Sequence, residues 1–300
     1  MSSHAHDHRH HGGPDYSRRF ALGIALNLAF VAVELICGLV AGSLALVADA
    51  GHNLGDVAGL LLAWGASWLA GFAPSPRRTF GFRKATVLAS LASAVLLLAG
   101  LGVIASEAVA RLRAPGAIDD SVMIAVAAVG VVVNAATALL FRSGRHTDLN
   151  LRGAYLHMAA DAAVSLGVVV GGLVIGLTGW FWIDPVLSLA IVLVILVGTW
   201  GLLRESAHLA LDGVPAGVDP DAVRRWLAAR PGVAAVHDLH IWALSTTETA
   251  LTAHLVMPAG HPGDRYLADT AGGLHREFAI DHATLQVELA DPDHGCSLGG

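Results

Sequence analysis

Six long apolar runs fill most of residues 20–204 in this 300-residue chain. A helix needs about 20 consecutive, mostly apolar residues to cross the hydrocarbon core of a bilayer. Charged side chains make up only 14% of the chain, whereas an ordinary globular domain carries about 25%. The sequence therefore predicts a polytopic α-helical membrane protein with six transmembrane helices. The predicted spans are Phe20–Ala41, Leu44–Leu69, Ala85–Val109, Ser121–Phe141, Leu149–Leu177 and Ile183–Leu203.

The basic residues between these runs predict the orientation of the chain. Lysine and arginine concentrate in the cytoplasmic connections of multi-spanning proteins. If the N-terminus is cytoplasmic, the outer connections hold only Arg111 and Arg113. The cytoplasmic segments then hold eleven basic residues, which are Arg9, Arg18, Arg19, Arg77, Arg78, Arg83, Lys84, Arg142, Arg145, Arg152 and Arg204. We therefore expect both termini to face the cytoplasm, with the spans in the inner (plasma) membrane.

Polar composition returns after the sixth run and predicts a separate C-terminal domain. Its expected order is α-β-β-α-β, which is typical of a ferredoxin-like α+β fold. Asp219 is expected to cap the first helix and Pro220 to occupy its first position. The predicted elements are the helices Asp219–Arg230 and Pro262–Phe278 and the strands Val233–Leu244, Thr247–Met257 and His282–Leu289.

The predicted organisation has five parts. A histidine-rich cytoplasmic tail (1–19), without the cleavage site of a signal peptide, precedes the six-helix transmembrane domain (20–205). A linker (206–213) leads to the cytoplasmic domain (214–290), and a C-terminal tail (291–300) follows. The tail histidines either capture metal ions or belong to a solvated segment, and they are His4, His6, His8, His10 and His11.

Two predicted spans carry the same polar pair, a histidine followed four positions later by an aspartate. The pairs are His52 and Asp56 in the second span and His157 and Asp161 in the fifth. Residues four apart lie on one face of an α-helix. A charged group in the middle of a span costs about 2.5–3.5 kcal/mol on insertion scales, so its presence needs a reason. Facing each other, the pairs would supply two imidazole nitrogens and two carboxylate oxygens, a tetrahedral set that suits Zn²⁺.

Each pair could instead be a buried hydrogen bond that ties helices together. The repetition of the same spacing in two spans at comparable depth favours a shared metal site. Asp49, one turn before the first pair, is a possible accessory residue: a relay, an entry ligand or a partner for Asn53.

The charges of the four residues indicate how such a site would work. Two neutral histidines and two aspartates balance one Zn²⁺. Without metal, two aspartates buried together cannot both stay ionised, so the empty site takes up protons. A cycle in which metal leaves as protons enter predicts an antiporter, with Zn²⁺ as transported substrate and protons as the counter-ion.

Other functional classes fit the sequence less well. A net charge of −6 argues against a nucleic-acid binder, and two cysteines cannot form a disulfide framework. A zinc metalloprotease would need an H-E-x-x-H motif, which the sequence lacks, and an open coordination position. A channel would need a continuous file of polar residues across the membrane, whereas the polar residues of these spans concentrate at one level. We therefore expect a secondary transporter and not an enzyme; the main alternative is a membrane-bound metal sensor, through which no metal crosses the bilayer.

Four segments resemble the cation diffusion facilitator family: GSLALVADAGHNLGD, RRTFGFRK, HMAAD and VHDLHIWALS. The resemblance runs from about Phe20 to Glu288 and is closest to the bacterial zinc-exporting branch. It implies a homodimer in the lipid bilayer that exports zinc from the cytoplasm by Zn²⁺/H⁺ exchange with alternating access, for metal homeostasis and resistance. The residues that match the family's transport ligands are His52, Asp56, His157 and Asp161.

The resemblance also bears on metal choice and on regulation. Histidine at the first of the four positions implies a preference for zinc over the larger, softer Cd²⁺, while carriage of Cd²⁺, Co²⁺ and Ni²⁺ stays open. Residues 214–290 correspond to the family's cytoplasmic metal-binding and dimerisation domain. The implied regulatory zinc ligands are His237, His254, His282 and Glu288; the alternative is that these are polar residues on the solvent face of a sheet.

The remaining polar residues carry weaker expectations. Strand alternation predicts that His282 and Glu288 share one face of the last strand, and that His237 and His240 face opposite sides of the first. Glu34 is expected to serve helix packing or a proton relay rather than metal ligation. Glu107 is expected to pair with Arg111 four residues later. Possible additional ligands lie in the fourth connection and in the C-terminal tail, at His146, Asp291, His294 and Cys296.

Overall fold

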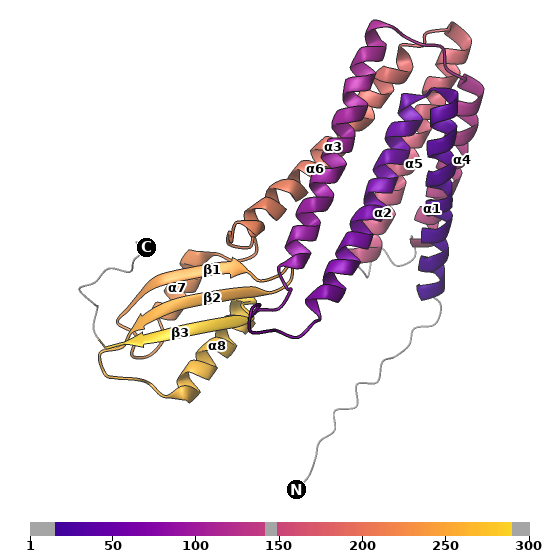
Figure 1. Ribbon diagram of the computed structural model, residues 1–300. Coiled ribbons are helices and arrows are strands. Elements are labelled where there is room, and N and C mark those ends of the chain that lie inside the picture. Colours follow the sequence, from indigo (N-terminus) through magenta and orange to yellow (C-terminus); the bar gives the residue numbers. More distant parts are fainter. Residues whose placement is uncertain (1–15, 142–148, 290–300) are drawn as a thin grey trace. The chain divides into compact units, whose positions relative to one another are not determined.

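The computed structural model describes residues 16–141 and 149–289, with side chains for 28–139 and 155–289 (Figure 1). Six long helices come first and a small α/β domain follows. The tail histidines, His146, and the three candidates in the C-terminal tail lie outside the described residues. The long helices are α1 (Tyr16–Ala41), α2 (Leu44–Ala70), α3 (Ala85–Arg113), α4 (Asp120–Phe141), α5 (Leu149–Thr178) and α6 (Ile183–Ala210).

Each predicted apolar run coincides with one of these helices. Among the described residues, four helices are long and apolar enough to cross a membrane: Ala85–Arg113, Asp120–Leu139, Tyr155–Thr178 and Ile183–Ala210. In α1 the described apolar part is Leu28–Ala41, and α2 is interrupted by polar residues at the candidate site. Six spans therefore stay a prediction, while a domain of apolar membrane helices is confirmed.

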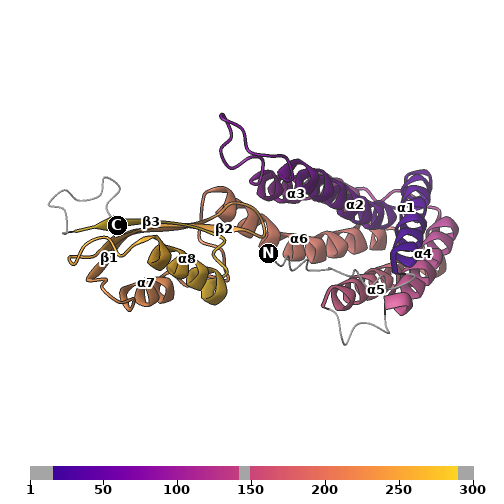
Figure 2. The same ribbon diagram turned by 90° about the horizontal axis from the view of Figure 1, so that it is seen from below.

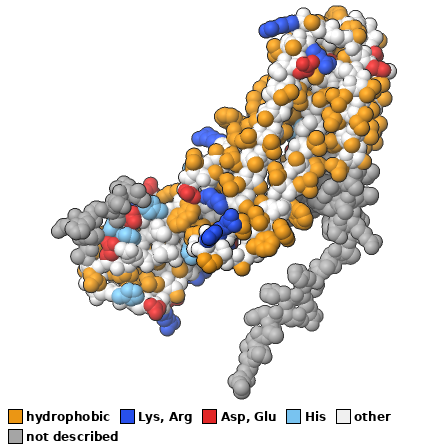
Figure 3. Space-filling view, viewed as in Figure 1, with side chains coloured by type: hydrophobic (Ala, Val, Ile, Leu, Met, Phe, Trp, Pro, Cys, Tyr) orange, Lys and Arg blue, Asp and Glu red, His pale blue; other side chains and the backbone are white. Residues whose placement is uncertain are grey.

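Apolar side chains cover the outside of the long helices (Figure 3). On α2, for example, Leu60, Leu61, Trp64 and Trp68 are all more than 60% exposed. In water such a surface would be an aggregation hazard, whereas lipid is as apolar as the side chains themselves. The exposed apolar surface fits the interior of a bilayer.

The chain divides into two compact units, and the first comprises residues 1–57 and 99–196. In it α4 packs along α5, and α1 lies beside α4 (Figures 1 and 2). The α1–α4 approach is close because Gly130 has no side chain: a Cβ there would lie 2.8 Å from the ring of Phe30 and 3.1 Å from Ser165 Oγ. Helices α1, α4 and α5 therefore meet tightly around this glycine.

Asp184, in the first turn of α6, caps the N-terminus of α2. Its carboxylate accepts hydrogen bonds from Ser43 Oγ (2.6 Å) and from the backbone N–H groups of Leu44 (2.8 Å) and Ala45 (3.2 Å). Ser43 Oγ in turn accepts from Leu46 N at 3.3 Å. The first N–H groups of a helix have no partner within the helix, and the helix dipole favours a negative charge beside them. Asp184 is fully buried, so this cap also fixes α2 to α6.

The second unit comprises residues 58–98 and 197–300 and contains the C-terminal domain. The predicted order α-β-β-α-β is present, and α7 is capped by Asp219 and begins at Pro220 as predicted. In the sheet, β1 pairs antiparallel with β2, and β2 pairs parallel with β3. The elements are α7 (Pro220–Ala228), β1 (Ala235–Ala243), β2 (Thr249–Val256), α8 (Asp264–Phe278) and β3 (His282–Glu288).

Helices α7 and α8 cover one face of this sheet (Figure 2). Between them lies an apolar core that includes Leu227 of α7, Leu251 and Leu255 of β2, and Leu274 of α8. The alternate residues of β2, Thr252 and His254, point away from this core and are only partly buried. Within the described part of the chain, no helix covers the polar face of the sheet.

The first strand departs from the predicted alternation. His237 pairs with His254 and His240 with Thr252, and the register shifts between the two pairs. A β-bulge therefore adds a residue to β1, and Asp238 in it has a positive φ of 49°. Since His254 and Thr252 lie on one face of β2, His237 and His240 share that face. The prediction that they face opposite sides was wrong, because strict alternation holds only for an uninterrupted ladder.

Candidate metal centre

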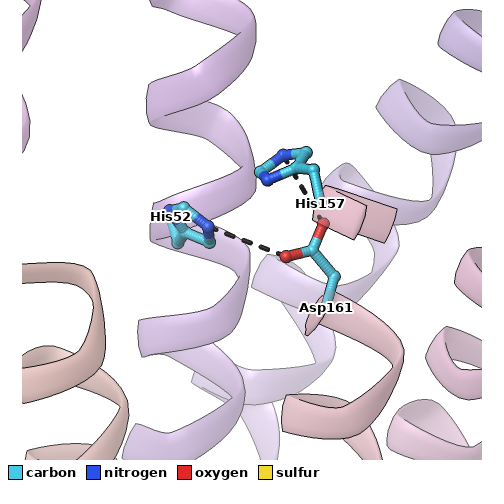
Figure 4. A group of neighbouring side chains, drawn as sticks. All are labelled: His52, His157 and Asp161. Carbon is cyan, nitrogen blue, oxygen red and sulfur yellow. Dashed lines mark ion pairs between the residues drawn. The ribbon is translucent and has the colours of Figure 1, made fainter. Parts of the chain in front are cut away.

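The two predicted His–Asp pairs meet in the first unit, one from α2 and one from α5. Figure 4 draws three of the four side chains, His52, His157 and Asp161. His52 Nε2 lies 3.8 Å from Asp161 Oδ1, and His157 Nε2 lies 3.6 Å from Asp161 Oδ2. Asp56 Oδ2 lies 3.1 Å from His157 Nε2 and 3.6 Å from His52 Nε2. Each aspartate therefore faces both histidines. The sequence predicts only the spacing within each helix, and the structure adds the approach of the two helices.

Three of these side chains are positioned so that a single ion could reach all of them. Ligand atoms of His52, His157 and Asp161 lie within 4.8 Å of one another, and Asp161 is the most buried of the three. The imidazole rings are 5.9 Å apart between centroids and stand edge to face. Nitrogen and carboxylate oxygen ligands in a four-residue set are typical of Zn²⁺.

Hydrogen bonding within the site is incomplete. Among the described side chains, Asp56 Oδ2 and Asp161 Oδ2 are buried and make no hydrogen bond of normal geometry, although imidazole nitrogens lie nearby, and the same holds for His52 Nδ1. Buried carboxylate oxygens normally have partners, because leaving one unpaired costs about 1–3 kcal/mol or more. Converging carboxylate oxygens that lack a hydrogen bond of normal geometry are suited to a cation or a proton.

Asp49 lies beside this group and not within it. Its carboxylate is 1% exposed and accepts a hydrogen bond from Ser165 Oγ of α5 at 3.0 Å. Among the described residues, Asp49, like Asp56, does not belong to the set of side chains whose ligand atoms converge on one point, and unlike Asp56 it forms no ion pair with either histidine. Its place agrees with an accessory role and leaves the choice of that role open.

A second cluster forms on the uncovered face of the C-terminal sheet. His237 Nε2 lies 2.8 Å from Glu288 Oε2, and His254 Nδ1 lies 2.9 Å from Glu288 Oε1. Ligand atoms of these three residues come within 4.8 Å of one another. His282 has the predicted face but lies at the other end of β3, about 20 Å along the strand from Glu288. Its ring instead stands 5.6 Å from that of Phe80.

Asp238, in the bulge of β1, joins this second cluster. Its carboxylate oxygens lie 2.9 Å from His240 Nε2 and 3.4 Å from His254 Nε2. This residue is not among those singled out from the sequence, since strict alternation would place it on the face opposite to that of His237. The sequence did contain an indication: in the run His-Asp-Leu-His, an acidic residue directly follows His237, which is a proposed regulatory ligand.

Both carboxylates of the second cluster are ionised at neutral pH. Partial burial raises the pKa of Glu288, but hydrogen bonds from His237 and Gln286 outweigh it and hold that pKa below its usual value. A hydrogen bond from His240 lowers the pKa of Asp238. Two ionised carboxylates beside three imidazoles form a set of donors that a divalent cation could use.

The remaining charged residues of the spans have separate roles. Arg111 Nε donates to Glu107 Oε1 at 3.0 Å, which confirms the predicted ion pair. Asp184 was not singled out from the sequence, although an aspartate at the second position of a predicted span was a visible signal. Glu34 is completely buried and contributes no atom to the metal-ligating groups.

Two family models match the chain over nearly its whole length. Residues 20–209 match the transmembrane domain of cation efflux proteins. Residues 215–290 match the dimerisation-domain model described as the cytoplasmic domain of cation efflux proteins.

Curated relatives are similar from end to end. The metal cation efflux system protein CzcD of Cupriavidus metallidurans is 38% identical over 286 residues, which cover 95% of this chain and 90% of that protein. The zinc transporter ZitB of Escherichia coli is 34% identical over 295 residues, or 98% and 94% of the two chains. A Bacillus subtilis protein named cadmium, cobalt and zinc/H(+)-K(+) antiporter is 30% identical over 297 residues, or 96% and 93%.

Among solved structures, the metal-bound C-terminal domain of the CzcD transporter from Cupriavidus metallidurans is 41% identical. The match covers 24% of this chain and 100% of that domain, with a TM-score of 0.23.

Proposed function

The chain belongs to the cation efflux family, and we propose that it exports zinc from the cytoplasm in exchange for protons, as a secondary transporter that works by alternating access. It is a multi-pass membrane protein of a family of divalent cation transporters. The observation that carries the proposal is the meeting of His52, Asp56, His157 and Asp161 between two membrane helices. These four residues are proposed to bind the transported ion.

Zinc as substrate follows from the chemistry of the ligands. Two imidazoles and two carboxylates are ligand types that Zn²⁺ prefers, and the four side chains together would fill a tetrahedron. No position would then be left for an activated water, as a hydrolytic zinc enzyme requires. A relative 34% identical to this chain is named a zinc transporter, which supports the same substrate.

Proton exchange follows from the charges of the same site. When zinc leaves, two aspartates remain side by side in a poorly solvated place and can no longer both be ionised. Protons from the outer side would then replace the metal. The name of the Bacillus subtilis relative, which includes H(+) among the exchanged ions, supports this counter-ion. One or two protons per zinc would satisfy the charges equally well.

Flux into proteoliposomes tests this proposal. The purified full chain is reconstituted, and zinc and proton movements are followed by a dye for each, with and without an imposed pH gradient. Zinc movement coupled to opposite proton movement is the expected result. Tight zinc binding without flux would contradict it and would favour a membrane-bound metal sensor, because the cytoplasmic cluster His237, His254 and Glu288 suits that role as well.

Metal choice gives a further prediction for His52. Replacing His52 with aspartate exchanges a nitrogen ligand for an oxygen ligand and makes the site more negative, so it is less specialised for zinc. We expect His52→Asp to raise the ratio of Cd²⁺ to Zn²⁺ flux severalfold in the same liposomes. Parallel assays with Co²⁺ and Ni²⁺ define the range. An unchanged flux ratio would show that His52 does not set the selectivity.

The cytoplasmic cluster is proposed to bind a regulatory metal ion in a homodimer. The match to a dimerisation domain supports self-association, and the uncovered polar face of the sheet holds the candidate ligands His237, His254 and Glu288. His282, on the same face, would join such a site only if a partner subunit brought the ends of the strands together.

The proposed membrane topology has six spans in the inner membrane, with both termini in the cytoplasm.

Asp238 provides the test of the cytoplasmic site. Because its carboxylate contacts His240 and His254, Asp238→Ala is expected to weaken binding of this metal ion by about 10- to 100-fold. The measurement is zinc titration calorimetry of the full chain, in which the transport site serves as an internal reference. Asp269→Ala, at an exposed position on α8, is the matched control. Equal affinities of the two variants would remove Asp238 from the site.

A further inference from the structure

The hairpin of α1 and α2 buries a glutamate that the proposed transport site does not use. Gly38 of α1 lies against Leu46 and Val47 of α2, where a Cβ would come within 3.0 Å of Leu46 Cβ. One turn back along α1 from this contact is Glu34, and one turn forward along α2 is Asp49. Both carboxyl groups are buried, with exposures of 0% and 1%.

Among the described residues, those that face Glu34 carry acidic and amide groups. The titratable groups around it are Asp49 from α2 and, further away, Asp161 from α5, and Asn53 of α2 faces it as well. Helix α4 passes the same region at Gly130 with no ionisable side chain. Among the described residues, no lysine or arginine forms an ion pair with Glu34 or Asp49.

The hydrogen bonds of this pair are also incomplete. Neither carboxyl oxygen of Glu34 has a hydrogen-bond partner of normal geometry among the described residues, and the same holds for Asp49 Oδ1. Asp49 Oδ2 accepts from Ser165 Oγ. Two carboxylates in apolar surroundings repel each other and lose their hydration, so at least one of them holds a proton or the pair holds a cation.

We propose that Glu34 and Asp49 share a proton and form a proton-binding site separate from the four metal ligands, which supplies one of the protons exchanged for zinc. The inference rests on the proposed antiport. A shared proton satisfies both carboxyl groups with one hydrogen bond between them, as in pairs of aspartates that cannot both ionise. A proton is held by two oxygens, one from each carboxyl group, whereas a hard divalent cation needs about six oxygen ligands.

Coupling to the metal site follows from the position of Asp161. Its charge acts on both Glu34 and Asp49. Zinc bound at the transport site neutralises Asp161 and places positive charge near the pair, which favours release of the shared proton to water. When zinc leaves, its positive charge is removed from the neighbourhood of the pair, which favours uptake of a proton by the pair. Zinc binding and proton binding thereby oppose each other, as antiport requires.

Neutral replacements in the full chain test the proposal. Glu34→Gln and Asp49→Asn imitate the protonated residues but cannot exchange a proton, and Glu107→Gln, at an exposed position of α3, is the matched control. The readout is the number of protons moved per zinc in proteoliposomes, together with the number released when zinc binds to the purified protein in detergent. The assays contain choline as the only other cation.

The expected result is a loss of about one proton per zinc in either variant, no greater loss in the double variant, and zinc affinity within a few-fold of the unmodified protein. The control keeps the original ratio. An unchanged ratio in Glu34→Gln would overturn the proposal, and so would failure of that variant to fold, because glutamine reproduces the proton-loaded state.

Two further outcomes separate this inference from the proposed function. If the unmodified chain couples zinc to protons while both variants do so normally, antiport stands and the second proton site is wrong. If the unmodified chain moves zinc without protons, both proposals are wrong. Coupling that requires added potassium or sodium would overturn the proton in favour of an alkali cation.

Discussion

Replacing Asp161 with asparagine is expected to reduce zinc transport to the background of empty liposomes while the protein stays folded. Asp161 faces both His52 and His157, at 3.8 and 3.6 Å, and is the most buried of the candidate ligands. Even residues that only orient metal ligands cost about 10- to 100-fold in affinity or activity when they are changed, so loss of a ligand should exceed 100-fold. Asparagine keeps the shape and removes the charge.

The measurement is initial zinc flux at saturating metal, accompanied by the melting temperature of the variant in detergent. Glu107→Gln, which removes an exposed acidic group of a membrane helix, serves as the control and should transport normally. The melting temperature of Asp161→Asn should not fall, because a buried, incompletely paired carboxylate has been replaced by a neutral group. Flux at the unmodified rate in a folded Asp161→Asn protein would refute the proposed transport site.

Replacing Asp184 with alanine is expected to be the most destabilising single change in the first unit. Asp184 accepts from Ser43 and from two backbone N–H groups at the start of α2, and its side chain is fully buried. Each hydrogen bond to a charged group contributes about 1.5–3 kcal/mol, and a lost helix cap costs about 1 kcal/mol. We therefore expect a loss of at least about 3 kcal/mol in the free energy of unfolding.

Thermal unfolding in detergent measures this effect, with Asp184→Asn as the matched variant. Asparagine keeps one acceptor oxygen but loses the charge that the helix dipole favours, so its melting temperature should lie between those of the other two proteins. Zinc transport should fall with the fraction of folded protein. Equal melting temperatures for Asp184→Ala and the unmodified chain would show that the cap of α2 does not depend on α6.

Local periodicity explains why the sequence alone singles out the four residues proposed to bind the ion. A helix places residues four apart on one face whatever surrounds it, so each His–Asp pair followed from its own segment. Charge in an apolar segment is rare enough to indicate function. By contrast, Asp184 and Glu34 acquire their roles from other helices, since the partner of each lies on a different segment of the chain.

The C-terminal sheet shows the same limit at finer scale. The alternation of β3 was predicted correctly, because that strand forms an uninterrupted parallel ladder with β2. In β1 a bulge between His237 and His240 reverses the alternation and brings Asp238 to the histidines. A bulge depends on pairing with the neighbouring strand, which local periodicity does not contain.

The amino-acid sequence by itself determined the apolar helices, the order of elements in the C-terminal domain and the four side chains proposed to bind the ion. Each of these depends on hydrophobicity or on spacing within one segment, and both are local properties. Only the tertiary structure decided that Asp184 caps α2, that Glu34 lies against Asp49, and that Asp238 joins His254. These are contacts between distant segments, and they depend on which helices and strands pack together and in which register.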